Sequence, residues 1–194
     1  MLIVLPVAAP AIASLYQQSV RHQAWLWLYG SNFLVAWKDA WVLPGFHHFW
    51  SLAVEEHFYL LWPFVIFLCN RRQAMIACAV SVIGAASLRV LLLWWGNSAV
   101  AVETLTPCRM DSLAIGGFLA LAARGPAGVR ALVPWVCAVA AMGGLAAAAL
   151  YWFVGSTWSL EHTFVALFFG AVVVVGITID PYGGAGRIWN SHAL

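Results

Sequence analysis

Residues 47–63, HHFWSLAVEEHFYLLWP, place two carboxylates and three histidines in an otherwise apolar segment. A charge at membrane depth costs roughly 2.5–3.5 kcal/mol on insertion scales, so it needs a partner, a proton or water. On a helix, Ser51, Glu55 and Tyr59 follow one another at four-residue intervals. His48 lies seven residues before Glu55 on the same stripe. This set predicts proton transfer, in which a histidine titrates near neutral pH and a glutamate orients it.

The neighbouring polar residues of this segment do not share that face. Glu56 points about 100° away from Glu55 around the helix axis. The competing interpretation is that the histidines and glutamates are ordinary residues at the mouth of a span, where water reaches them. That interpretation is favoured for His47 and stays open for Glu56 and His57.

A second group of polar residues occupies TLTPCRMDSLAIGGFLA, residues 104–120. Arg109 and Asp111 are two residues apart, so on a helix they face nearly opposite directions and each is expected to reach another helix. The fixed guanidinium of Arg109 suits a carboxylate, a phosphate or a developing oxyanion. The alternative is a structural salt bridge from Arg109 to Glu55 or Glu56.

Three further features are expected to be mainly structural. Arg89 lies deep in the apolar segment 73–95, and we expect it to pair with a carboxylate of the bundle rather than to act in catalysis. Gly116 and Gly117 are expected to let another helix approach. His162 begins the last apolar segment and is interpreted as a solvated boundary residue.

The amino-acid composition indicates the class of protein, and so the kind of helices, that must hold these residues in place. Of the 194 residues, 64% are hydrophobic and 8% are charged, and the net charge is +2. A soluble domain is roughly 45–50% apolar and about 25% charged, so soluble, disordered and nucleic-acid-binding proteins are excluded. Twelve Trp residues fit the two membrane–water interfaces. The four cysteines form no CxxC pair, and no metal site is predicted.

Continuous apolar runs predict an all-α, polytopic transmembrane helix bundle of about six to seven spans, formed by a single domain, residues 1–194. A span needs about 20 apolar residues, so three of the candidates are short. The candidates are 1–16, 24–37, 49–69, 73–95, 109–123, 131–153 and 162–179.

Basic residues predict the orientation, because cytoplasmic loops carry an excess of Lys and Arg. The loops at 71–72, 124–130 and 180–187 hold most of the arginines and are assigned to the cytoplasm. The 38–48, 96–108 and 154–161 loops then face outward. The chain is therefore predicted to be an integral membrane protein that is located in the bacterial inner (plasma) membrane.

The two polar segments together resemble the acyltransferase-3 family of integral membrane acyltransferases. The family pattern His-x-Trp-Ser-Leu-x-x-Glu-x-x-Phe-Tyr-Leu-x-x-Pro is matched from His48 to Pro63, with Trp50, Ser51, Glu55 and Tyr59 at their places. A second pattern, Arg-x-Asp-x-Leu-x-x-Gly, is matched by Arg109, Asp111, Leu113 and Gly116. The Gln that usually follows the paired Glu is His57 here. The resemblance covers essentially the whole chain.

The resemblance implies transfer of an acetyl or other acyl group from acyl-CoA, as co-substrate, to a hydroxyl of a cell-surface sugar or related lipid-linked acceptor, with no bound cofactor. It implies His48, Glu55, Arg109 and Asp111 as catalytic residues, supported by Trp50, Ser51, Glu56 and Tyr59. The family's upstream helix with its histidine, its basic pair and its closing helices have no counterpart here, so we expect 1–194 to be the central part of a longer domain. Either His48 or that upstream histidine would then be the general base.

Two other classes of protein remain as alternatives. A proton-coupled transporter or channel would use the same intramembrane carboxylates to carry protons. A non-catalytic membrane scaffold would tolerate Glu55→Gln without any change in activity.

Overall fold

The computed structural model of the chain describes residues 17, 20–43, 45–154 and 160–179. The expected span at 1–16 and the expected cytoplasmic loop at 180–187 lie outside these residues. The described part is a bundle of α-helices, in agreement with the all-α prediction. Its helices are α2 (Gln23–Trp27), α3 (Ser31–Lys38), α4 (Phe49–Leu68), α5 (Arg71–Trp94), α6 (Ala99–Thr104), α7 (Thr106–Ala123), the short 3₁₀ turn η1 (Val129–Leu132), α8 (Val133–Val154) and α9 (Glu161–Thr178).

Four of these segments are long and apolar enough to cross a membrane. They are Phe49–Leu68, Arg71–Trp94, Val129–Phe153 and Glu161–Thr178. The 18 residues of α7 fall outside this group because its first half carries Arg109 and Asp111. The expected single span at 24–37 forms two helices of 5 and 8 residues instead, and each is too short to cross a bilayer. The count of six to seven spans is therefore not confirmed.

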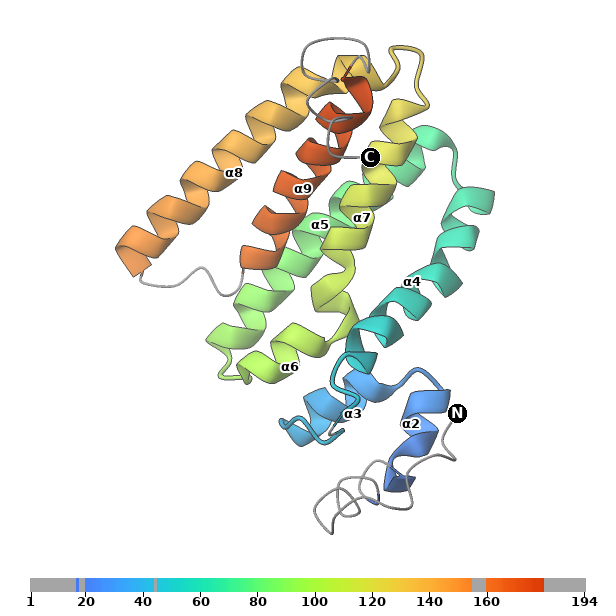
Figure 1. The fold of residues 1–194 in the computed structure, drawn as a ribbon, viewed down its shortest axis with the longest axis vertical. Helices are drawn as coiled ribbons and strands as arrows, with labels where there is room; N and C mark the ends of the chain where they lie inside the picture. The colour runs from blue at the N-terminus through green and yellow to red at the C-terminus, as the bar shows by residue number, and fades with distance from the viewer. Residues whose placement is uncertain (1–16, 18–19, 44, 155–159, 180–194) are drawn as a thin grey trace, which may run out of the picture.

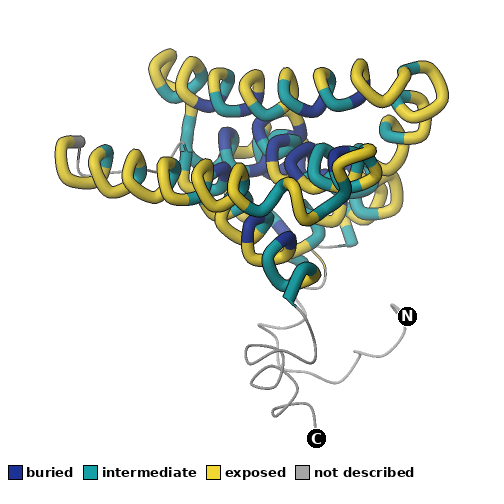
Figure 2. The backbone as a smooth tube through the Cα atoms, turned by 90° about the horizontal axis from the view of Figure 1, so that it is seen from above, coloured by how far each residue is buried: buried dark blue, intermediate teal, exposed yellow. Residues whose placement is uncertain are grey.

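The outer surface of the bundle is apolar. At most 17% of the residues in any of the four candidate spans are buried inside the protein. Large side chains such as Phe67 and Trp152 are more than 80% exposed. Figure 2 shows the buried positions gathered on the inward sides of the helices and the exposed positions around the outside. A continuous apolar surface of this kind fits a lipid environment rather than water.

The long helices alternate in direction, so their ends gather at two opposite ends of the bundle (Figure 1). One end holds the connections from α4 to α5 and from α7 to η1. The other holds the beginnings of α4, α7 and α9, the end of α5, and the short helices α3 and α6, which lie across it. This alternation agrees with the expected alternation of the loops, and the cytoplasmic side remains a prediction.

Part of the expected outward loop at 96–108 is helical. Ser98 caps α6, because its hydroxyl accepts a hydrogen bond from the Ala101 amide at 3.0 Å. The extended backbone of Leu105 separates α6 from α7, which begins at Thr106 with Pro107 in its first turn. A proline is favoured in that position, since the missing N–H has no helical partner there. This break places α7 three residues earlier than the sequence predicts.

Small residues set the distances between neighbouring helices. A Cβ atom added to Gly117 on α7 would lie 2.9 Å from the ring of Trp62 on α4. One added to Gly170 on α9 would lie 2.9 Å from Leu119 on α7. A Cβ atom added to Gly116 would meet nothing within 4 Å among the described residues, so no described helix approaches it there and the expectation for Gly116 is wrong. It lies on the exposed side of α7.

The first turn of α5 joins it to the end of α7. Asn70 and Gln73 form a reciprocal capping box at the start of α5. The Arg71 guanidinium donates to the carbonyls of Leu121 and Ala122 at 2.8 and 3.4 Å. A cation at the last carbonyls of a helix is favoured by the helix dipole. Arg71 thus has a structural role besides its expected effect on orientation.

Candidate functional site

α4, α7 and α9 begin at the same end of the bundle (Figure 1), and the sequence-predicted residues other than Tyr59 lie near the beginnings of α4 and α7. Trp50 and Glu55 lie in the first two turns of α4, and Arg109 and Asp111 in the first two turns of α7. The antiparallel path of α5 brings Arg89, near its end, to the same level. Two polar pockets and two buried polar clusters occupy this end.

The first pocket, here called the α4–α7 pocket, is lined by three predicted site residues of α4 and by Arg109 of α7. It has a volume of about 90 Å³. The α4 side contributes Trp50, Ser51, Val54 and Glu55, and the α7 side contributes Arg109, Ser112 and Leu113. The structure therefore brings the carboxylate of the first motif and the cation of the second motif into one cavity.

Arg109 is held in this pocket by an aromatic ring rather than by an ion pair. Its guanidinium carbon lies 5.4 Å from the centre of the Trp50 ring, which is a cation–π distance. Within the described residues no carboxylate lies within 4.0 Å of it, so the alternative of a structural salt bridge to Glu55 or Glu56 is not formed. Its buried Nη1 atom has no hydrogen-bond partner in the part of the chain that is described. Buried donors are almost always satisfied, so this N–H group is suited to a ligand or to water.

The rest of the polar stripe on α4 has other surroundings. His48 is the N-terminal flanking residue of α4 and is exposed, and its carbonyl accepts a hydrogen bond from Ser51 Oγ at 2.9 Å. Tyr59 is 56% exposed on the outside of the helix. Neither residue lines the α4–α7 pocket, and neither does Glu56, as its different helix face predicts.

Asp111 belongs to a buried cluster that also contains Arg89 of α5 and Thr163 of α9. Arg89 Nη2 donates to Asp111 Oδ2 at 2.9 Å, and both side chains are almost fully buried. Thr163 donates its hydroxyl to the same carboxylate oxygen and accepts from Arg89, which also donates to the Cys108 carbonyl. The expectations that Asp111 reaches another helix and that Arg89 pairs with a carboxylate are both confirmed. The cluster connects α5, α7 and α9.

A second buried cluster was not recognised in the sequence. Thr106 Oγ1 accepts a hydrogen bond from Asn32 Nδ2 at 2.7 Å and lies 2.8 Å from His57 Nδ1. Asn32 is fully buried on α3, and His57 belongs to α4. These contacts join α3, α4 and α7 only one helical turn from Glu55 and Arg109. The signal for this cluster was an asparagine within an apolar segment, Asn32 within 24–37.

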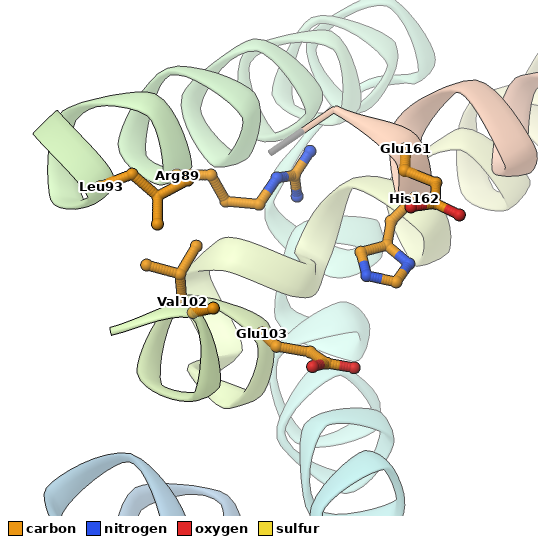
Figure 3. Close-up of a pocket in the computed structure, with 7 residues that line it drawn as sticks. Arg89, Leu93, Val102, Glu103, Glu161 and His162 are labelled. Carbon is orange, nitrogen blue, oxygen red and sulfur yellow. The ribbon is translucent and has the colours of Figure 1, made fainter. Parts of the chain in front are cut away.

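The second pocket, here called the α5–α6–α9 pocket, has a volume of about 140 Å³. Its polar lining comprises Arg89 of α5, Glu103 of α6, and Glu161 and His162 of α9 (Figure 3). The sequence analysis interpreted His162 as a solvated boundary residue, whereas the structure places it half-buried in the wall of this cavity. Only the packing of α6 against the other helices reveals this grouping.

The fold and these pockets define an α-helical bundle with apolar outer faces and a polar site at one end. Among the described residues, no three His, Cys, Asp or Glu side chains are grouped so that they could hold a metal ion. In comparisons with known proteins, no family model, no curated protein and no solved structure matches this chain.

Proposed function

We propose that the protein is an integral membrane acyltransferase, which moves an acetyl or other acyl group from an acyl-CoA donor to a hydroxyl of a cell-surface sugar or related acceptor. The observation that carries the proposal is the α4–α7 pocket. Glu55 and Arg109 line it together, and Arg109 Nη1 is buried without a partner among the described residues. The motif resemblance of residues 48–63 and 109–116 supports the same reaction.

The chemistry of acyl transfer explains why a carboxylate and an unpaired arginine are useful in one cavity. An acceptor hydroxyl has a pKa far above 7, so a base must take its proton as it attacks the thioester carbonyl. The attack produces a negatively charged tetrahedral intermediate, which positioned donors stabilise. In the proposal, Arg109 supplies those donors, and Glu55 accepts a proton or orients the group that does. His48 stays a candidate base on the same stripe.

Asp111 has a different part in this proposal from the one that the motif implies. Its contacts are with Arg89 and Thr163 rather than with the α4–α7 pocket. It therefore acts as a positioning residue, because the cluster holds the first turns of α7 that carry Arg109. Trp50 and Ser51 are supporting residues in the pocket wall, and the Trp50 ring makes a cation–π contact with the Arg109 guanidinium.

The experiment is acyl incorporation from labelled acetyl-CoA into cell-surface acceptors, with the reading frame that contains this chain expressed in membranes. Wild-type protein is expected to label the acceptor, and Glu55→Gln is expected to abolish labelling while membrane insertion stays intact. Near-wild-type product from Glu55→Gln by mass spectrometry would contradict the role of this carboxylate. Proton or solute flux without any acyl incorporation would favour the transporter instead.

A further inference from the structure

A large apolar cavity, here called the α5–α8 groove, lies away from the candidate site. It has a volume of about 580 Å³, and residues of α5, α7, η1, α8 and α9 line it. Most of these residues belong to the first halves of α5 and α8 and to the second half of α7, so the groove lies toward the end opposite the candidate site. α5 packs along α7 and α8 packs along α9, and the groove separates these two pairs of helices (Figure 1).

The lining of the groove suits hydrocarbon rather than water. Every residue that lines it is of a hydrophobic type, and none is charged. Apolar cavities of about 150 Å³ stay dry and accept a molecule of the size of benzene, whereas a buried water needs polar partners. The groove has nearly four times that volume, which is room for much of a lipid tail.

The groove is open to the outside of the bundle along α8. Val139 and Trp135, which belong to its α8 wall, are 44% and 72% exposed. None of the residues in the apolar window of Val129–Phe153 is buried inside the protein. Helices in a membrane are held by van der Waals packing, and a hydrocarbon chain in the groove supplies packing atoms that α5 does not supply to α8.

Arginines lie where three walls of the groove reach the end of the bundle. Arg71 and Arg72 begin α5, and Arg124 directly follows α7. Arg130 belongs to η1, two residues before Leu132 of the groove lining. The hydrogen bonds from Arg71 to the last carbonyls of α7 hold the first two of these places together.

This end of the bundle is positively charged. Arg72, Arg124 and Arg130 are exposed, and they form no side-chain hydrogen bond or ion pair with the described residues. Of the seven acidic residues, Asp180 lies outside the described part of the chain. The other six lie toward the opposite end, and they are Asp39, Glu55, Glu56, Glu103, Asp111 and Glu161. Clusters of arginine just beyond the ends of membrane helices attract the headgroups of anionic lipids.

We propose that the α5–α8 groove and the arginines at its end form a binding site for an anionic phospholipid such as phosphatidylglycerol. One acyl tail lies in the groove between the two pairs of helices. The headgroup phosphate binds Arg124 and Arg130, whose donors have no other partner among the described residues. The groove alone suits any hydrocarbon and the arginines alone suit any anion, so their adjacency selects a molecule that has both parts. The site does not depend on the reaction proposed for the opposite end.

The first test measures the binding of phosphatidylglycerol and phosphatidylcholine to the purified protein in a neutral detergent, by native mass spectrometry. Arg124→Gln with Arg130→Gln is compared with Arg21→Gln with Lys38→Gln. Arg21 precedes α2 and Lys38 ends α3, both are exposed, and both short helices lie at the opposite end (Figure 1). The control pair therefore removes the same amount of charge away from the groove.

An arginine near an anionic lipid contributes about fivefold to the binding constant. Loss of Arg124 and Arg130 is therefore expected to weaken the binding of phosphatidylglycerol about 25-fold and to leave that of phosphatidylcholine unchanged. The control pair is expected to stay within about threefold of wild type for both lipids. Equal losses in the two pairs would overturn the proposal, because they would show attraction to the net charge of the protein and not to a site.

The second test fills the groove. Val139→Trp places a large ring in the lining, and Met142→Trp is the control, because Met142 is 69% exposed on the same helix and does not line the groove. Both side chains are exposed enough to be enlarged without overpacking the core. Val139→Trp is expected to lose the tightly bound phosphatidylglycerol, and Met142→Trp is expected to keep it.

Three other outcomes would overturn the lipid site. Undiminished binding of phosphatidylglycerol to Val139→Trp would show that the tail lies elsewhere. Displacement of the lipid by free coenzyme A would mean that the arginines hold a soluble phosphate. A dimer of the wild-type protein that Val139→Trp dissociates would mean that a second copy of the chain occupies the groove.

Discussion

Two arginines lie at the same end of the bundle, and they differ in how many of their donor groups have partners. Arg89 is 1% exposed and binds the Asp111 carboxylate, the Thr163 hydroxyl and the Cys108 carbonyl. Arg109 lies on the Trp50 ring in a small cavity, and its buried Nη1 has no partner in the described part of the chain. The first guanidinium joins three helices, and the second is presented to a cavity.

The difference shows why charge at membrane depth is not by itself a sign of catalysis. A buried cation that is fully surrounded by acceptors connects helices, and removing one partner leaves a costly unpaired charge. A cation whose donors are only partly used keeps the capacity to bind an anionic group. The predictions below test this division between a structural and a functional arginine.

The largest expected effect is on stability, from Arg89→Leu. The change leaves the Asp111 carboxylate buried without its cation, which costs about 3–5 kcal/mol. We expect a strongly lowered thermal unfolding temperature in detergent or nanodiscs, whereas Arg109→Leu should unfold close to wild type. The double variant Arg89→Met with Asp111→Leu should recover much of the loss, because an apolar replacement removes both charges. Wild-type unfolding of Arg89→Leu would contradict the structural role.

The next effect is on rate, from Arg109→Lys. A lysine keeps the charge but loses the planar fork of donors, and its ammonium is a compact point charge beside the Trp50 ring. Loss of one charge-stabilising group typically costs roughly 10²–10³ in rate. We expect kcat/KM for acyl transfer to fall by that amount with an unchanged unfolding temperature. A change of less than about threefold would make Arg109 an ordinary charge at a helix end.

A smaller loss of activity is expected from Glu56→Gln. This residue follows Glu55 in the chain but does not line the α4–α7 pocket. Comparison with Glu55→Gln at matched expression therefore separates the pocket from the general charge of the segment. Equal losses in the two variants, measured as acyl product by mass spectrometry, would show that the two helix faces are not functionally distinct.

The smallest effect is expected at the paired glycines of α7, and its sign differs between them. Gly117→Ala brings a methyl group to 2.9 Å from the Trp62 ring, and overpacking of this kind costs about 1–3 kcal/mol. Gly116→Ala meets open space, so the helix propensity of alanine should stabilise it by up to about 1 kcal/mol. Thermal unfolding of both variants checks the contrast. Similar shifts for the two would mean that Trp62 moves aside without cost.

The long helices could be predicted closely from the sequence. The expected spans 49–69, 73–95, 131–153 and 162–179 correspond to α4, α5, α8 and α9 within a few residues. Each is an apolar run ended by polar residues, and a helix satisfies its own backbone in lipid. The segment 24–37 is not a single span, because the helix is interrupted between Trp27 and Ser31. Apolar composition alone does not reveal such a break.

The candidate site was predictable only in part. Glu55 and Arg109 were singled out by their charge in apolar surroundings, and the structure places them in one cavity. Asn32 was not singled out, and His162 was interpreted as a solvated boundary residue, because a lone polar residue near a helix end has no recognisable partner in the sequence. Arg89 was expected to pair with a carboxylate and Asp111 to reach another helix, but only the structure shows that each is the partner of the other.

By itself, the sequence determined that this chain forms apolar helices and that a few polar residues lie within them. It did so because hydrophobicity and helix formation depend on residues close together in the chain. Only the tertiary structure decided which polar groups satisfy one another, which remain available, and which helix ends share a cavity. Those choices depend on side chains from different helices, such as Arg89 and Thr163, that are 74 residues apart in sequence and in hydrogen-bonding contact in the bundle.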